Sequence, residues 1–410
     1  MNQKYPWLLP ILLSPLGLII PIAPRSGPLW VLLIGIAGIV HFIRHRPSLD
    51  WLKSPPIYAL CVFLAYLFLT GFWSINPERS FEQAFRLTML AFFGLAGYSL
   101  VRSLEEYQKR RVVQCLLPAL FVGIVTGCVY GLLQYTGGCI RILTDFLGLS
   151  PEFSSFRGDS RLHIAKTMLL TNFAFFSVFP WLWNKQRIAA LLAYGLFFTV
   201  CWHSDSQTSL VTCLAGGCIF AALQFSYRRA TKITLAVIIA SFFLIIPITQ
   251  SSTFKTFTTN IEQTSFGARS SMDTRKRIYE LFGLMSIEKP IFGHGLMAGV
   301  KYNGEMPSID LRGITNEIKT PHNVHLQIIF DLGAIGAGLG LLCFAWPILS
   351  WQARGNRRMA IAALMAVALM LAGTLFNFVI WRIWIAAAAV MTFYFLLLSS
   401  PKSEYNESGS

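Results

Sequence analysis

The chain has 410 residues, of which 54% are hydrophobic, 14% aromatic and only 13% charged, and its mean hydropathy is +0.56. Soluble domains carry about a quarter charged residues, so this composition excludes a soluble enzyme, a disordered chain and a coiled coil. The formal net charge of +15 must lie in loops and at helix ends, where it faces membrane surfaces and anionic substrates and not nucleic acid.

Long apolar runs predict an all-α polytopic membrane protein with about twelve transmembrane helices. The predicted spans cover residues 7–24, 28–43, 56–74, 85–101, 112–135, 164–183, 188–203, 208–226, 233–249, 324–350, 359–377 and 383–398. No small-residue cleavage site clearly follows the first run, so we expect a span there and not a cleavable signal. Several runs are short for a bilayer, which predicts tilted helices or half-buried helix ends.

An even number of spans places both termini on one side of the membrane. The short connections on that side carry Arg44, Arg46, Lys53, Arg102, Lys109, Arg110, Arg111, Lys185, Arg187, Arg228, Arg229, Lys232, Arg354, Arg357 and Arg358. Short basic loops stay in the cytoplasm, so we expect cytoplasmic termini.

Two connections on the outer side are long, over residues 134–163 and 250–323. The predicted organisation is therefore transmembrane helices over 1–249, a large outer loop over 250–323, transmembrane helices over 324–398 and a polar, mobile tail over 399–410. Long loops in compact proteins are often functional. The positive-inside rule does not account for the basic residues of this outer loop, because it applies to short loops.

Residues 274–289 of the outer loop predict an amphipathic helix, capped by Asp273 or Thr274 and ended by Pro290. Its apolar face holds Ile278, Leu281, Phe282 and Met285, and we expect this stripe to lie on the membrane. Its first turn holds Arg275, Lys276 and Arg277. Three cations beside free backbone N–H groups suit an anion such as phosphate. A basic helix that only touches lipid headgroups is the alternative.

The stretch from Thr320 to Asn323 predicts the start of the tenth span, with Pro321 in the first helical position and Thr320 as its cap. His322 would then lie in the first turn at the outer membrane surface. A helix N-terminus disfavours the imidazolium, so we expect a neutral His322 that suits a general base. His325 follows on nearly the same face. Taken singly, each histidine also fits a purely structural role.

Motifs that hold metals or nucleotides are missing from the sequence. It contains no Asp-x-Asp pair, no His-Glu-x-x-His motif, no Walker loop and no dinucleotide-binding glycine fingerprint. We therefore predict a reaction without a metal or another cofactor.

The outer loop and the tenth span resemble the C-terminal signature of bacterial O-antigen ligases and O-antigen polymerases. The matching residues are Arg275, Pro290-x-x-Gly293-x-Gly295, His322-Asn323-x-x-Leu326 and Asp331-x-Gly333. Upstream, residues 73–80 (WSINPERS) resemble the family's connection between its third and fourth spans. The predicted topology, a GT-C-like bundle with a large loop between the ninth and tenth helices, is similar to that of the family.

The resemblance implies an inverting, metal-independent glycosyltransferase that acts on the periplasmic face of the bacterial inner membrane. Ligases of this family transfer a glycan from undecaprenyl diphosphate to a sugar hydroxyl of lipid A-core. His322 corresponds to the family's base, and Arg275 to the loop arginine that binds the donor diphosphate. Further candidates for diphosphate binding are Arg86, Arg157, Arg161 and Arg277, with Asn323 and His325 in supporting positions.

One position departs from the family pattern. The family often has an arginine where the eighth span opens, whereas this chain has Gln207. A neutral amide does not replace a cation that binds diphosphate. Either Arg157 and Arg161 compensate, or this chain handles its donor differently.

A ligase is favoured over the nearest alternative, an O-antigen polymerase, because one outer loop dominates where polymerases tend to have two. A protein O-oligosaccharyltransferase is a third enzymatic interpretation. A small-solute transporter belongs to another class and would place ionisable groups near the bilayer midplane. The predicted spans contain almost no charges, and Asp331 is the clearest exception.

Two further patterns suggest structural roles. Tryptophans near span ends, among them Trp381 and Trp384, predict aromatic belts at the membrane interfaces. The series Gly333, Gly336, Gly338 and Gly340 predicts close packing of the tenth span against a neighbouring helix.

Overall fold

A computed structural model of the protein describes residues 8–13, 26–46, 50–135, 160–204, 206–262, 272–301, 321–353, 355, 357–374 and 381–399. Within these ranges every regular element is a helix. Arg157, Thr320 and the tail after Ser399 lie outside them.

The helices of the bundle follow the predicted spans. They are α1 (Leu8–Leu13), α3 (Gly27–His45), α4 (Pro55–Thr70), α5 (Pro77–Ser103), α6 (Glu106–Tyr135), α8 (Ser160–Lys185), α9 (Arg187–His203), α10 (Gln207–Gln250), α14 (Val324–Ala353), α15 (Arg357–Thr374) and α16 (Ile383–Ser399). Among the described residues, α3, α5, α6, α10 and α14 are long and apolar enough to cross a membrane, and α4, α9, α15 and α16 are shorter apolar helices. The predicted class, an all-α polytopic membrane protein, is confirmed.

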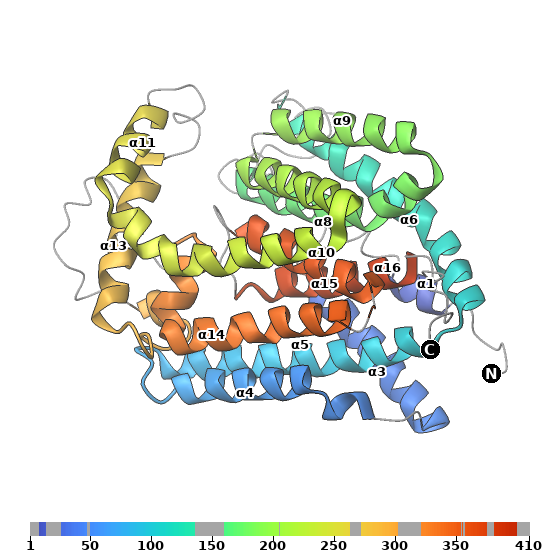
Figure 1. The fold of residues 1–410 in the computed structure, drawn as a ribbon, viewed down its shortest axis with the longest axis horizontal. Helices are drawn as coiled ribbons and strands as arrows, with labels where there is room; N and C mark the ends of the chain where they lie inside the picture. The colour runs from blue at the N-terminus through green and yellow to red at the C-terminus, as the bar shows by residue number, and fades with distance from the viewer. Residues whose placement is uncertain are drawn as a thin grey trace, which may run out of the picture.

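The remaining elements are α11 (Ser252–Glu262), α13 (Met272–Glu288) and two short 3₁₀ turns, η2 (Asp50–Lys53) and η4 (Ala298–Lys301). Helices α11 and α13 lie across one end of the bundle, at the left of Figure 1. This end carries the residues of the predicted outer loop, and we call it the α13 end.

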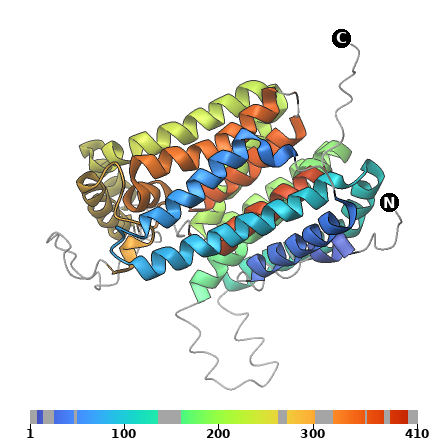
Figure 2. The ribbon, with the colours of Figure 1, turned by 90° about the horizontal axis from the view of Figure 1, so that it is seen from below.

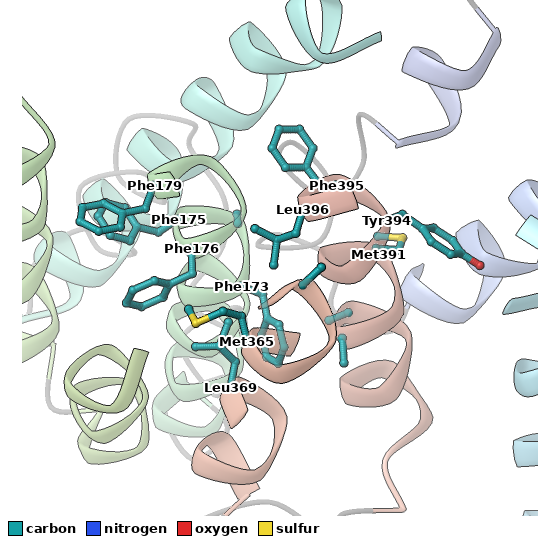
Figure 3. Close-up of a cluster of buried hydrophobic side chains, with 14 of the residues drawn as sticks. Phe173, Phe175, Phe176, Phe179, Met365, Leu369, Met391, Tyr394, Phe395 and Leu396 are labelled. Carbon is teal, nitrogen blue, oxygen red and sulfur yellow. The ribbon is translucent and has the colours of Figure 1, made fainter. Parts of the chain in front are cut away.

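Helices α15 and α16 lie at the centre of the bundle. Helix α16 packs against α3, α5, α6 and α8, and α15 packs against α8, α10 and α14. The view in Figure 2 shows the same helices running side by side. Phe173 and Phe176 of α8 meet Leu369 of α15 and Phe395 of α16 in a buried cluster (Figure 3). Aromatic and aliphatic side chains thus hold the core together.

Helix α10 contains two spans, as the sequence predicts. Its backbone is non-helical at Ser226 (φ −156°, ψ 92°). Gln207 at its start contacts Arg275 of α13, and Gln250 at its end donates a hydrogen bond to the Glu280 carbonyl of the same helix. Arg275 and Glu280 are only about 8 Å apart along α13, at 1.5 Å per residue. Helix α10 therefore folds back at Ser226 as an antiparallel pair.

Helix α5 begins at Pro77, earlier than the predicted start at residue 85. The additional turns contain Arg79 and Glu82, and Glu82 forms ion pairs with Arg79 and with Arg86 in the turn that follows. These polar turns lie outside the apolar run, so a prediction from hydrophobicity alone placed the helix start too late.

Helix α14 is broken at Gly333 (φ 64°, ψ −168°), and residues 290–296 fill the break. We call this arrangement the α14 joint. Four backbone hydrogen bonds replace those that the break removes. The N–H groups of His294 and Gly295 donate to the carbonyls of Phe330 and Asp331, at 2.8 Å each. The N–H groups of Ala334 and Ile335 donate to the carbonyls of Pro290 and Ile291, at 2.8 and 3.1 Å. The predicted span over 324–350 matches α14, but its hydrophobic pattern does not reveal the break at Gly333.

The end of α4 and the connection that follows it dock on the α14 joint. The Tyr66 hydroxyl donates to the Leu332 carbonyl at 2.8 Å. The Ser74 hydroxyl donates to the Leu296 carbonyl at 3.2 Å. The two stretches that carry the family resemblance, residues 73–80 and 290–296, are distant in sequence but form one structural unit.

Helix α13 begins at Met272, two residues before the predicted start, and ends at Glu288. Its apolar stripe packs against Leu326 and Phe330 of α14 and does not lie on the membrane surface. The prediction of a membrane-facing stripe was therefore wrong. Helix α14 covers the stripe in place of lipid, and this packing fixes α13 relative to the start of α14.

Candidate active site

The starts of three helices converge at the α13 end of the bundle. Arg275 lies in the first turn of α13, and its Nη1 donates to the Oε1 of Gln207, the first residue of α10, at 3.3 Å. The side chain is partly buried, and burial lowers the pKa of Arg275 below its usual value. Among the described residues no carboxylate forms an ion pair with it. Within the described part of the chain, the site therefore presents a desolvated cation without an acidic partner.

Tyr279 lies one turn after Arg275 on the same face of α13. Its side chain is 5% exposed, and among the described residues no partner meets the geometry of a hydrogen bond to its hydroxyl, although the Asn323 side chain lies near enough to act on its pKa. Burial raises the pKa of Tyr279, while nearby Arg275 and the Asn323 side chain act in the opposite direction. Tyr279 thus links the cation of α13 to the start of α14 and places an O–H donor between them.

Asn323 caps α14. Its Oδ1 accepts hydrogen bonds from the N–H groups of His325 and Leu326 at 3.0 and 3.1 Å. The helix begins at Val324, so the prediction that Pro321 opens the helix was wrong. The asparagine side chain satisfies two N–H groups that the start of a helix leaves free, and this decides where the helix begins.

His322 precedes this cap and does not lie within the first helical turn. Its backbone is left-handed, with φ 50°, and its side chain is partly exposed. Left-handed conformations are uncommon for residues other than glycine, and observed strain of this kind occurs often at functional sites. The turn holds His322 directly before the start of α14, next to Asn323.

The two other histidines of this region are enclosed by protein. His325 is 4% exposed, its Nε2 lies 2.8 Å from the Ser241 hydroxyl, and its ring meets Phe242 edge to face. His294 is 2% exposed, and its Nε2 lies 2.9 Å from the Met285 carbonyl. His325 therefore does not share a face with His322, contrary to expectation, because His322 is not helical.

The other arginines predicted to bind diphosphate lie on several different elements, and their convergence on Arg275 stays a prediction. Arg86 is exposed on α5 and pairs with Glu82. Arg277 lies on α13, two residues after Arg275. Arg161 lies in the first turn of α8, where only the backbone is described, and Arg157 lies outside the described residues.

Sequence reasoning did not identify Tyr279 and treated Gln207 only as a departure from the family pattern. Tyr279 follows Arg275 by four residues, and this helical spacing was a usable signal. No sequence pattern connects Gln207 with Arg275, because the fold-back of α10 brings them together.

Within the described part of the chain, no group of three or more His, Cys, Asp or Glu side chains is placed to hold a metal ion. The donors at this site are a guanidinium, a phenol, amides and an imidazole. These groups suit the binding of an anion and the movement of a proton.

Residues 189–341 match the family model described as O-antigen ligase. The match includes Gln207, Arg275, Tyr279, His322 and the whole α14 joint. No curated protein and no solved structure matches the chain. Over residues 189–341 the chain is thus similar to the O-antigen ligase family.

Proposed function

We propose that the protein is an O-antigen ligase of the bacterial inner membrane. It transfers a glycan from undecaprenyl diphosphate to a sugar hydroxyl of lipid A-core on the periplasmic face, with inversion and without a metal. In this proposal the outer loop over 250–323 carries the chemistry, and the helices over 1–249 and 324–398 hold it at the membrane. The observation that carries the proposal is the placement of Arg275 where α10, α13 and α14 begin.

Arg275 suits the donor diphosphate. A partly buried charge that meets only the neutral amide of Gln207 among the described residues is costly, and an anionic ligand lowers that cost. The starts of helices add partial positive charge. A diphosphate is a good leaving group once its developing charge is neutralised, and a guanidinium provides this by bidentate hydrogen bonds in a site of lowered dielectric. The Tyr279 hydroxyl is a further donor for a phosphate oxygen.

His322 suits the acceptor. The histidine lies at the partly exposed edge of the site, next to Asn323 and therefore close to Tyr279. In its neutral form the imidazole accepts the proton of the acceptor hydroxyl as the oxygen attacks the sugar carbon and the diphosphate leaves. The remaining arginines, Arg86, Arg157, Arg161 and Arg277, are secondary candidates for donor binding.

The test measures glycan transfer by purified protein with a lipid-linked donor and lipid A-core. His322→Ala should lower the rate by about 10²–10⁴-fold, the usual contribution of a general base, with donor binding retained. Tyr279→Phe should weaken donor binding by about tenfold without loss of folded protein, because the described residues offer the lost hydroxyl no hydrogen bond of good geometry. His294→Gln is the matched control, since that ring faces the protein interior.

Normal turnover of His322→Ala would overturn the assignment of the base. A strain without the protein separates the ligase from the polymerase. Lipid A-core without polymer, together with long lipid-linked polymer, is the expected result. Accumulation of single repeat units would instead show a polymerase.

A further inference from the structure

Five helices enclose a cavity that the proposed transfer reaction does not use. Helices α4, α5, α16, α15 and α14 form a ring in which each packs against the next. The cavity between them has a volume of about 1200 Å³ and is lined from all five helices. Pockets for small ligands usually measure about 300–1000 Å³, so this cavity is large enough for a long ligand.

The wall of the cavity is apolar along most of its length. It includes Leu64 of α4, Leu90 of α5, Leu341 and Phe344 of α14, and Val390 and Phe393 of α16. On α4 the lining residues extend from Ser54 to Leu67, about 20 Å at 1.5 Å per residue. One leaflet of a bilayer has a hydrocarbon depth of about 15 Å, half of the whole core. The cavity therefore matches the length of an acyl chain.

Trp381 lines the end of the cavity that faces the α14 joint. Its Nε1 donates to the Asp331 carboxylate at 2.6 Å, and its carbonyl accepts from the Gln83 side chain at 2.8 Å. Asp331 is 1% exposed and adjoins the α14 joint. Neither Arg275 nor His322 is among the described lining residues, and the hydrogen bonds of Trp381 lie at the end of the cavity nearer to them.

The opposite end of the cavity is basic. Its lining includes Lys53 before α4, Arg102 at the end of α5 and Lys109 at the start of α6, with Glu106 as the one carboxylate. Glu106 forms an ion pair with Lys109 at 3.1 Å. Among the described lining residues, three cations stand against one carboxylate, so the formal charge of this mouth is positive.

We propose that this cavity binds an anionic phospholipid, with its phosphate at Lys53, Arg102 and Lys109 and an acyl chain inside the ring. Basic residues at a membrane surface attract anionic headgroups, and the apolar wall takes a hydrocarbon chain in place of water. The positive-inside rule assigns this end to the cytoplasmic leaflet. The site is therefore on the side opposite the lipid-linked donor and does not depend on the proposed transferase reaction.

The experiment uses full-length protein purified in detergent, to which phosphatidylglycerol or phosphatidylcholine is added. Bound lipid is counted by native mass spectrometry. Wild type should retain phosphatidylglycerol at least tenfold better than phosphatidylcholine. The combined variant Lys53→Gln, Arg102→Gln, Lys109→Gln should lose this preference. The matched control is the double variant Arg228→Gln, Arg229→Gln, which removes two cations from the α10 bend, outside the cavity lining. This variant should keep the preference for phosphatidylglycerol.

A second variant tests the apolar part without altering charge. Gly340 lines the cavity, and a Cβ there would make only ordinary contacts with Phe63 at 3.7 Å, so Gly340→Leu should fold and fill the cavity. It should bind at least tenfold less phosphatidylglycerol. Equal retention of both lipids by wild type would overturn the proposal. Binding lost in Gly340→Leu but unchanged in the triple variant would also overturn it, because the occupant would then be an apolar chain without an anionic headgroup at this mouth.

Discussion

Arg275 and Gln207 define the chemistry of the site at the scale of single residues. The amide occupies a position where related proteins often have arginine, and here it accepts a hydrogen bond from Arg275. Two guanidinium groups at this distance would repel each other, whereas the amide orients one guanidinium and leaves its charge for a ligand. The departure from the family pattern therefore suits an anion site built around one central cation.

Replacement of Gln207 by Glu should inhibit donor binding. A carboxylate 3.3 Å from the guanidinium would neutralise Arg275 and occupy the place of the diphosphate. Charge-assisted hydrogen bonds contribute about 1.5–3 kcal/mol, so the donor dissociation constant should rise by about 10- to 100-fold. Titration of the purified variant with lipid-linked donor checks this. Gln207→Met, similar in size and neutral, should bind donor nearly as wild type does, and unchanged binding by the Glu variant would contradict the role of Arg275.

At the scale of elements, the α14 joint is the feature on which the site depends. It fixes residues 290–296 against the first turns of α14, and the apolar stripe of α13 covers the same turns. The position of Arg275 relative to His322 therefore follows from backbone hydrogen bonds and one buried helix face. Neither element positions the site alone.

Alanine at Gly293 or Gly333 should disrupt the joint. Both glycines have positive φ, and an added Cβ would lie 2.6 Å from the Asp331 carbonyl oxygen or 2.3 Å from the Ile291 carbonyl oxygen. The left-handed conformation alone costs about 1–2 kcal/mol for other residues, and the clashes add to it. Both variants should show a clearly lower midpoint of thermal unfolding in detergent. Gly338→Ala, whose Cβ meets nothing within 4 Å, should unfold at or above the wild-type temperature.

The α14 joint should also weaken in acid. Burial lowers the pKa of His294; the Met285 carbonyl and Glu288 oppose this effect, and Lys289 adds to it. The unfolded chain, with a histidine pKa of about 6.5, then binds more protons than the folded one. Stability contributed by neutral His294 is complete above this value and is lost as the pH falls below it.

The measurement compares unfolding of wild type and His294→Gln at pH 7.5 and pH 5. Glutamine keeps a donor for the Met285 carbonyl but does not titrate. Wild type should lose more stability than the variant over this interval. Equal losses would show that the acid sensitivity arises elsewhere.

At the scale of the whole molecule, the sequence predicted what depends on hydrophobicity. The helix order, the pair of spans within α10 and the amphipathic helix α13 all follow from apolar spacing. Contacts that depend on three dimensions were not predictable. The sequence predicted Trp381 in an aromatic belt at the membrane interface, yet its side chain is 6% exposed and donates a hydrogen bond to Asp331. The sequence predicted close helix packing at Gly333, yet the backbone of α14 is broken at this residue.

The candidate site shows the same division. Arg275 and His322 were identified through a family resemblance, and their roles stay predictions. The capping role of Asn323 and the buried Tyr279 hydroxyl became visible only in three dimensions, because both depend on α13 lying against the start of α14. A sequence pattern gives the residues of a motif but not which of them face each other.

The orientation in the membrane is testable with single cysteines in a variant whose eight cysteines are replaced. Lys289→Cys follows α13, Arg229→Cys lies in the α10 bend, and both positions are exposed. A membrane-impermeant maleimide added to spheroplasts should label position 289 and leave position 229 unlabelled until the membrane is opened, because short basic connections stay in the cytoplasm. The reverse pattern would place the candidate active site in the cytoplasm.

The α14 joint also determines which amino-acid substitutions this part of the protein can tolerate. Its hydrogen bonds connect amides and carbonyls, which every residue type except proline supplies in full. The backbone part of the joint therefore depends on where glycine is required, and only its docking contacts, such as those of Tyr66 and Ser74, depend on particular side chains. We expect substitutions elsewhere around the joint to be tolerated more readily than substitutions of these glycines.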